Sequence, residues 1–357
     1  MGGSSTASRH TPKCKITVDG TTLSSKLISG LREIYVDQAT DMADAFVFVL
    51  HNDGAKASDA KELQPGKKVE IELGYQDNGG KTTKVIEGEI TALKAVFPRK
   101  GVSTLRVHGL TKFHRLKRGR YTRAFNGLTY TQIAQKIAKE VGLTPACDPT
   151  QPAHEYVFQR NQSNLEFLTL LADRVGFEVF ANDGKLFFRK PTPDSTSVRK
   201  LEMGKSLLSF NPRIQAARVP QDVYAQDWDY EKKDFFFGES KATDAPAGMG
   251  GQTSAPDVAK PLGEARNTFY EHAFKDKDEA TNFVKAVMKE SALNLVYAEA
   301  STQGMPDLRP GFVVEVDEVG PIFSGQYYIT RVVHDYLPHG FATRLGLRRT
   351  SLDKPPA

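Results

Sequence analysis

A series of short motifs occurs twice in this chain, first over residues 63–107 and again over residues 308–345. Each copy opens with a Leu-x-Pro-Gly turn signal. It continues with alternating β-branched and acidic residues, an isolated glycine, an Ile-Thr pair, and a further glycine that leads into a last β-rich segment. The gaps between matched glycines differ, as loops of different length on one frame allow. The shared order predicts two related small β-barrels.

The first copy belongs to a β-rich unit that we place at residues 15–112. Gly, Asp and Asn turn signals separate its runs of β-branched and aromatic residues, which is the spacing of a small barrel or sandwich. Residues 1–14 precede this unit and are predicted to be a flexible leader. The segments predicted as strands are residues 15–18, 45–50, 67–74, 84–95 and 103–109.

Residues 113–200 are predicted to form an α+β domain inserted between the two barrels. The hydrophobic period changes here from two to about 3.6. Two segments, residues 129–141 and 163–175, begin with the spacing of a capping box and end at a glycine, so both are predicted helices. Asp183 and Gly184 lie between two strand-like runs and favour a tight hairpin, because they tolerate positive φ angles.

The second β-barrel domain is expected over residues 201–350. Its centre is interrupted by residues 241–262, which are rich in Gly, Ala, Pro, Ser and Thr and are predicted to be a flexible excursion that adds little to the core. Residues 276–294 carry apolar residues at helical spacing and are predicted to be a long helix. Residues 351–357 form a short polar tail.

The composition is that of a globular protein made in a reducing compartment. The chain has 357 residues and a net charge of +5, with 39% hydrophobic and 25% charged residues. No uncharged apolar run approaches the roughly 18 residues of a membrane span, and the first residues hold no apolar segment of a secretion signal. Cys14 and Cys147 lie too far apart in sequence to indicate a zinc site or a disulfide scaffold. We therefore expect cytosolic synthesis and no membrane anchor.

Residues that could act in catalysis or bind a metal form no recognised motif. The histidines match no metal-binding signature, and no G-x-S-x-G elbow is present. Asp227 and Asp229 would share one side of a strand. They can be read as a carboxylate pair or as part of a polar strand face, and we favour the second. We predict no catalytic residue, no cofactor and no metal. The histidines are His10, His51, His108, His114, His154, His272, His334 and His339.

One segment of the chain is strongly basic. It contains no acidic residue, and its basic side chains could contact either phosphates or an acidic protein surface. We favour protein contacts at the junction between the first barrel and the inserted domain, because no aromatic stacking platform accompanies the segment in the sequence. The candidate partner-contact residues are Lys112, Arg115, Lys117, Arg118, Arg120 and Arg123.

Several motifs in order resemble the phage late-control D tail hub family, which includes the hub region of the valine-glycine repeat spike proteins of type VI secretion. The resemblance covers about residues 15–350, and no single motif would suffice for it. The matching segments are GRYTRAF at 119–125, TYTQIAQKIAKEVGL at 129–143, QSNLEFL at 162–168, LADRVG at 171–176, LLSFNPR at 207–213, Trp228-Asp229, LRPG at 308–311 and FSGQYY at 323–328.

The resemblance implies a structural role and a symmetry. Hubs of this family are trimers, and three chains with two barrels each would form a pseudo-sixfold ring that adapts a hexameric tail tube to a threefold spike. It implies synthesis in the bacterial cytoplasm and assembly into a virion tail or an extracellular injection particle. The chain shows no oligonucleotide-binding-fold domain, β-helical needle or lysozyme-like segment. The needle would then be another polypeptide or be absent, and the expected partners are a separate spike protein, tail tube or tube-initiator proteins and other baseplate proteins.

Two other classes of function remain as alternatives. A nucleic-acid-binding protein would use the basic residues 112–123, and its affinity for duplex DNA would fall steeply with salt. A cell-wall hydrolase of the baseplate would depend on Asp227, Asp229 and the scattered histidines. The leading hypothesis is a structural hub of a phage tail, a tailocin or an extracellular injection particle, with no enzymatic activity.

Overall fold

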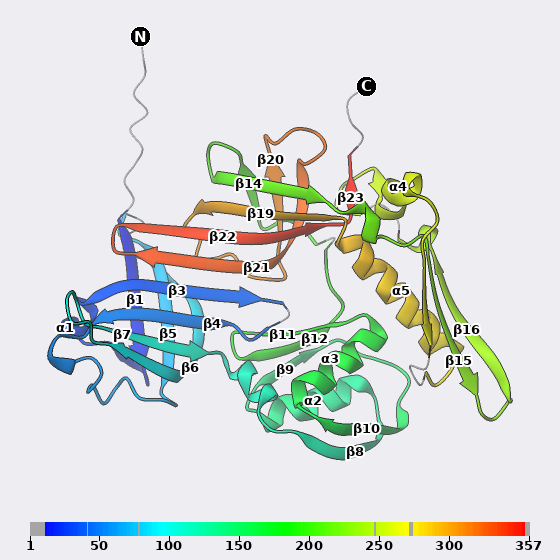
Figure 1. Cartoon of the computed structure of the whole chain (residues 1–357), viewed down its shortest axis with the longest axis horizontal. Helices are drawn as coiled ribbons and strands as arrows, with labels where there is room; N and C mark the ends of the chain where they lie inside the picture. The colour runs from blue at the N-terminus through cyan, green and yellow to red at the C-terminus, as the bar shows by residue number, and fades with distance from the viewer. Residues whose placement is uncertain are drawn as a thin grey trace, which may run out of the picture.

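The computed structural model of the chain describes residues 11–40, 42–77, 79–193, 195–245, 248–270 and 274–353. Most of its regular elements are strands, and helices are few (Figure 1). Residues 1–10 of the predicted leader, residues 354–357 of the predicted tail, and His10 and His272 lie outside the described residues.

One long sheet runs through both duplicated units (Figure 1). The units are joined where β3 pairs antiparallel with β21, from Ala39 opposite Arg331 to Ile34 opposite Tyr336. The hydrogen-bonded order is β14 (Leu207–Ile214), β19 (Val296–Gln303), β22 (Gly340–Arg349), β21 (Gly325–Leu337), β3 (Leu31–Ala39), β4 (Ala45–His51), β7 (Thr104–Leu110), β6 (Thr82–Val96), β5 (Lys68–Tyr75), β1 (Pro12–Val18) and β2 (Thr21–Thr22). β13 (Arg199–Glu202) and β20 (Val313–Asp317) extend the sheet from β21.

The two copies of the motif series fold in the same way. Gly66 and Gly311 both have positive φ, 88° and 85°, which glycine adopts without strain. The Gly66 N–H donates to the carbonyl of Ile90 at 2.8 Å, and the Gly311 N–H donates to the carbonyl of Ile329 at the same distance. β6 and β21 then each have a bulge directly after that isoleucine. The duplication is therefore present in the backbone hydrogen bonds as well as in the sequence.

A second pair of bulges extends the correspondence beyond the motifs. β3 has a bulge after Leu31 where it pairs with β4, and β14 has one after Leu207 where it pairs with β19. Bulges displace the strand register, so they are reliable markers of equivalent positions. β3 of the first unit thus corresponds to β14 of the second, and β6 of the first corresponds to β21 of the second.

Buried apolar residues form one large cluster in each of three regions, namely the first β unit, the inserted segment and the second β unit. Tyr336 and Phe341 of the second β unit pack into the cluster of the first. Tyr75 of the first unit in turn lies 5.7 Å from Phe341, between ring centroids. The two β units are therefore packed together as well as paired strand to strand.

The inserted segment folds into helices and short strands, and both predicted capping boxes are formed, at Thr129 and at Ser163. The hairpin predicted at Asp183 and Gly184 is also present, and both residues have positive φ. The elements are the 3-10 helix η2 (Lys112–Lys117), β8 (Tyr121–Leu128), α2 (Tyr130–Glu140), β9 (Thr144–Cys147), β10 (His154–Gln162), α3 (Asn164–Val175), β11 (Glu178–Asn182) and β12 (Lys185–Arg189).

Two buried polar contacts attach the inserted segment to the second β unit. Tyr328 on β21 donates a hydrogen bond to Glu178 on β11 at 2.9 Å. Tyr130 on α2 donates one to Glu279 at 2.6 Å, at the start of the long helix α5 (Lys277–Leu293). Burial raises the pKa of both tyrosines, so both stay protonated donors at neutral pH. These contacts fix how the inserted segment sits on the sheet.

The helix α5 also supports a small separate sheet on the right of Figure 1. That sheet has the order β16 (Asp234–Lys241), β15 (Asp222–Asp229) and β18 (Arg266–Tyr270), and α5 packs against β15 and β16. The first β unit further contains α1 (Ser25–Ile28) and the 3-10 helix η1 (Asp53–Ala55), and the 3-10 helix η3 (Ala216–Arg218) follows β14.

The prediction of a flexible excursion at residues 241–262 is wrong over its described part. Ala255 and Ala259 are buried in the core of the second β unit, because their small side chains allow a short helix to pack closely. The segment contains η4 (Ala242–Asp244), β17 (Thr253–Ser254), α4 (Ala255–Ala259) and η5 (Lys260–Leu262), and β17 pairs with β23 (Ser351–Leu352). The predicted tail therefore begins with a strand, and the predicted leader ends in one, since β1 starts at Pro12.

We expect Ala255→Glu to destabilise the protein by about 3 kcal/mol or more, because it places an unpaired charge in the core. Lys260→Glu, at an exposed position of the same segment, should stay within about 0.5 kcal/mol of the wild type. Urea unfolding followed by circular dichroism measures both. Equal midpoints for the two variants would show that this segment does not pack against the core.

Candidate functional site: the basic segment and the unpaired strand edges

The six basic residues of the predicted partner-contact segment have different surroundings in the structure. The segment starts in η2 and ends in β8, and three of its arginines are paired with acids of the same chain. Arg115 binds Glu89, Arg120 binds Glu166 at 3.2 Å, and Arg123 binds Glu140 at 2.9 Å. These acids come from β6, α3 and α2. The three arginines therefore hold neighbouring elements of their own chain together.

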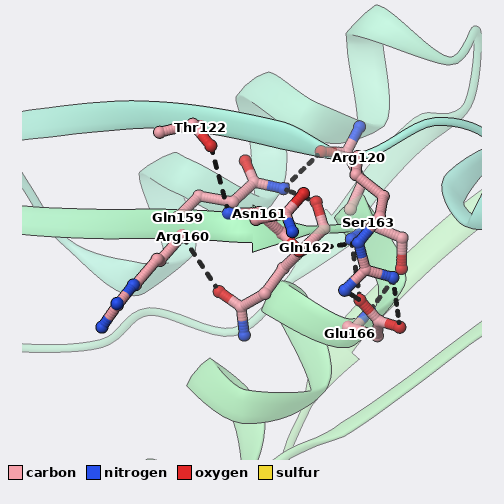
Figure 2. Close-up of polar contacts among 9 residues, drawn as sticks. Arg120, Thr122, Gln159, Arg160, Asn161, Gln162, Ser163 and Glu166 are labelled. Carbon is pink, nitrogen blue, oxygen red and sulfur yellow. Dashed lines mark hydrogen bonds and ion pairs between the residues drawn. The ribbon is translucent and has the colours of Figure 1, made fainter.

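Arg120 stabilises the connection between β10 and α3 (Figure 2). Its Nε donates to the carbonyl oxygen of Asn161 at 2.7 Å, and Asn161 has a positive φ of 46° at the bulged end of β10. The same guanidinium binds Glu166, whose other role is to close the capping box with Ser163. One side chain thus supports both the strand end and the helix start.

Arg123 is the most enclosed of these arginines. It donates to Gln159 at 2.9 Å and to Asn164 at 3.0 Å, in addition to its ion pair with Glu140. Its guanidinium lies 5.0 Å from the ring centres of Tyr121 and Phe125. Arg123 therefore has a structural environment that leaves little of its charge for a partner.

Lys117 and Arg118 are the members of the segment that remain available to a partner. Both are exposed, and neither forms an ion pair with any residue in the described part of the chain. Lys112 is half-buried. The pKa of Glu87 on β6 is lowered against burial by the hydrogen bond and charge of Lys68, and then by the charges of Lys84 and Lys112. Within the described part of the basic segment, it is therefore the turn between η2 and β8 that presents exposed positive charge without an ion pair.

Two strand edges form a second candidate site, which the sequence motifs did not indicate. Beyond its bulge, β6 pairs with β7 on one side, and no described strand lies on the other. β14 pairs with β19 on one side and with no described strand on the other. Unpaired edges offer backbone donors and acceptors to another chain.

Both edges carry exposed apolar side chains. On β6 and directly after it, Val96 is 38% and Phe97 60% exposed, and on β14 Leu208 is 54% and Ile214 38% exposed. The equivalent strands of the other unit, β21 and β3, pair with each other. In the described part of the chain, β3 and β21 therefore pair with each other, whereas the equivalent edges of β14 and β6 have no partner strand. The sequence could have indicated this site if the duplication had been extended to align Leu31 with Leu207, because that alignment makes β3 and β14 equivalent strands.

The pairing between β3 and β21 has a buried carboxyl group beside it. Asp44 precedes β4 and accepts hydrogen bonds from the Gln38 side chain at 3.2 Å and from the Ala39 N–H at 3.3 Å. Burial raises the pKa of Asp44 to about 7, and the positive charge of Arg309 partly opposes that rise. We therefore expect Asp44, beside this junction, to exchange its proton near neutral pH.

The carboxylates predicted as a strand face or a catalytic pair serve the local backbone. Asp227 accepts from the Phe274 N–H at 2.8 Å, and Asp229 accepts from the N–H groups of Glu231 and Lys232 at 3.0 Å. Lys232 also forms a 3.0 Å ion pair with Asp229. These contacts agree with the polar strand face that we favoured.

The described histidines do not converge on a site. His114 lies beside the carbonyl of Thr111 at 2.9 Å, and His334 is buried next to Thr343 at 3.0 Å. Burial lowers the pKa of His334 to about 3, so this ring is neutral at physiological pH. Within the described ranges no group of three or more His, Cys, Asp or Glu residues could hold a metal ion.

Solved structures with a fold similar to this chain include phage tail proteins and a component of the type VI secretion system. The 43 kDa tail protein of prophage MuSo2 from Shewanella oneidensis is 15% identical, with a TM-score of 0.72 over 96% of this chain and 100% of that one. The tail protein of Neisseria meningitidis MC58 is 14% identical, with a TM-score of 0.71 over 95% of this chain and 96% of that one. The Escherichia coli c3393 protein, a component of the type VI secretion system, is 14% identical, with a TM-score of 0.61 over 96% of this chain and 79% of that one.

The fold is therefore that of phage tail proteins and their type VI secretion relatives, as the sequence resemblance predicted. A model of the Alg8 N-terminal domain matches residues 8–337, and the chain belongs to that family. The matching model is not one of the late-control D family named from the motifs. No curated protein matches the chain in sequence. None of the helices in the described part of the chain is long and apolar enough to cross a membrane.

We expect Arg120→Ala to lower the free energy of unfolding by about 1 to 2 kcal/mol, because it leaves the Asn161 carbonyl and Glu166 without their shared donor. Arg118→Ala removes the same charge from an exposed, unpaired position and should change stability by less than about 0.5 kcal/mol. Chemical denaturation of the two variants compares them directly. Equal losses would show that Arg120 has no structural role.

We also expect stability to depend on Asp44 as the pH changes. Its folded pKa of about 7 exceeds the reference value of 3.8, so the folded state binds more protons between these values. The free energy of unfolding therefore falls as the pH rises from about 4 to 7, and by about 2 to 3 kcal/mol between pH 5 and pH 8. Asp44→Asn should remove this part of the fall, whereas the exposed Asp59→Asn should not. Urea titrations at pH 5 and pH 8 test this, and a fall unchanged in Asp44→Asn would contradict it.

Proposed function

We propose that this protein is a structural hub of a contractile injection machine, in which three copies close into a ring through β14 of one chain and β6 of the next. The observation that carries the proposal is the match between these unpaired edges and the β3–β21 pair inside the chain. The fold shared with phage tail proteins and a type VI secretion component supports the same role.

The ring follows from repeating a contact that the chain already makes. Within one chain, the β3 edge of the first unit meets the β21 edge of the second. A neighbour placed with its β6 edge against β14 would repeat that contact between chains. Three chains would then present six similar β units around one axis, and the free edges of β14 and β6 would both be paired.

The chemistry of the two edges suits such a contact. Val96 and Phe97 on one side and Leu208 and Ile214 on the other would leave water when the strands pair. Obligate interfaces of this kind bury on the order of 2,000 Å² or more. Pro212 on β14 has no N–H, so the ladder there would hold fewer hydrogen bonds than the β3–β21 ladder, and the apolar contacts would carry more of the affinity.

The assembled ring would adapt one symmetry to another. Six β units would dock on a hexameric tail tube or its initiator, and the opposite, threefold end would seat a separate spike protein with an oligonucleotide-binding fold and a β-helix. The inserted domain at residues 113–200 would face other baseplate proteins, with Lys117 and Arg118 as contact residues. The protein would work by shape and surface contacts, without catalysis or a cofactor, after synthesis in the bacterial cytoplasm.

The two edges can be blocked separately. Val96→Asp with Phe97→Asp places charges on the β6 edge, and Leu208→Asp with Ile214→Asp places them on the β14 edge. Each double variant should be a monomer in sedimentation velocity, because a head-to-tail ring needs both edges of every chain. Leu262→Asp, at an exposed apolar position in η5, is the matched control and should remain a trimer.

Mixing the two double variants sharpens the test. The open β14 edge of one can pair with the open β6 edge of the other, so a one-to-one mixture should form heterodimers and nothing larger. A trimer that persists in either double variant, or a dimer formed by one variant alone, would contradict this edge pairing. A particle reconstruction with six equivalent copies of the chain in place of three would contradict the ring.

A further inference from the structure

The polar face of the long sheet is neutralised where the two units of one chain meet. Arg331 on β21 forms a two-point ion pair with Asp37 on β3, with N–O distances of 2.6 and 2.8 Å. On the other side of β21, Arg344 of β22 binds Asp335 of β21 at 2.7 Å. We call this junction the internal seam. Each cation on it has an acidic partner in the same chain.

The equivalent positions between chains carry different charges. Residues at the same distance from equivalent bulges occupy equivalent positions. By this count, Lys94 on β6 is equivalent to Val333 on β21. Arg213 on β14 is likewise equivalent to Asp37 on β3. Val333 lies opposite Asp37. In the proposed ring, Lys94 of one chain would therefore lie opposite Arg213 of the next.

A third cation, Arg106, lies beside Lys94. Arg106 on β7 lies directly opposite Lys94 on β6, so both project from the same face of the sheet. Lys94, Arg106 and Arg213 are all exposed, and none forms an ion pair with a residue in the described ranges. We call the place where they would meet the basic seam.

The nearest acids form no ion pair with the cations of the basic seam in the described ranges. Glu299 is diagonal to Arg213 across β14 and β19, and its carboxylate accepts a hydrogen bond from the Tyr297 hydroxyl at 3.1 Å. Glu33 on β3 is separated from Arg106 by Val49 on β4. Like charges directly opposite on a sheet cost roughly 0.2 to 1 kcal/mol per pair. The basic seam is therefore unfavourable until an anion occupies it.

We propose that the basic seam, formed by Lys94 and Arg106 of one chain and Arg213 of the next, binds carboxylate side chains of a threefold-symmetric protein partner. This inference rests on the proposed ring. A closed ring would contain three basic seams alternating with three neutral internal seams, so the charge pattern is threefold although the backbone pattern is nearly sixfold. A trimer with one acidic patch per chain fits this pattern, because each patch meets an identical seam.

Nucleic acid fits the same charges less well. A phosphate backbone is a continuous line of charges without threefold symmetry. The basic seams would be separated around the ring by internal seams whose arginines are already paired with Asp37 and Asp335. A strand could therefore engage one seam at a time, whereas a trimeric partner engages all three together.

The test uses the full chain and a fluorescein-labelled peptide of fifteen glutamates, with binding followed by fluorescence anisotropy. The wild-type trimer should bind the peptide with an affinity that falls as salt is added. Lys94→Gln, Arg106→Gln and Arg213→Gln in one chain should weaken binding at least tenfold. Lys26→Gln, Lys56→Gln and Lys61→Gln remove the same charge from exposed positions of the first β unit and should change it less than twofold.

Sedimentation velocity on the same samples separates the two proposals. The seam variant should remain a trimer and should dissociate less readily than the wild type at low salt, because the repulsion between Lys94 and Arg213 is gone. A monomeric wild type would overturn the ring, and the seam with it. A trimer that binds the peptide equally well with and without the seam cations would overturn the seam alone. Tighter binding of a fifteen-nucleotide oligothymidylate through the same three residues would assign the seam to nucleic acid and overturn the protein partner.

Discussion

The antiparallel pairing of β3 with β21 is the contact on which the rest of the molecule depends. It joins strands that lie almost 300 residues apart in sequence, with Asp37 and Arg331 paired across it. Because the pairing makes one sheet of the two β units, Tyr336 and Phe341 can pack into the core of the first unit. Without it the duplicated units would be two small cores, and small cores bury too little apolar surface to be very stable.

The inserted segment is placed by polar contacts that only a correct fold can satisfy. Glu178 and Glu279 are largely buried carboxyl groups, and each accepts a hydrogen bond from a tyrosine of another region. A buried carboxyl group without its partner costs more than an exposed one, so misplacing the segment is penalised at both points. The segment therefore has one position on the sheet, and the orientation of η2, with Lys117 and Arg118 beyond it, follows from that position.

Local patterns in the sequence predicted much of the fold and little of the site. The helices at Thr129 and Ser163 and the hairpin at Asp183 were predictable because their signals lie within a few residues of one another. The strand β3 was missed, since its alternation is short and its partner β21 lies at the far end of the chain. Composition also misjudged residues 241–262, because the alanines that suggested a linker there pack in the core.

The same limit explains why the basic segment looked like a single contact surface. A run of cations is visible in the sequence, but the acids that pair with Arg115, Arg120 and Arg123 come from three elements that only the fold brings together. The reverse holds for Lys94, Arg106 and Arg213, which lie in separate parts of the sequence and look unremarkable there. Their unpaired charge becomes significant because two bulges give their strands the register of a pair that the chain already forms. In a duplicated fold, the contact that one pair of strands makes inside the chain identifies which equivalent edges have no partner in the described part of the chain.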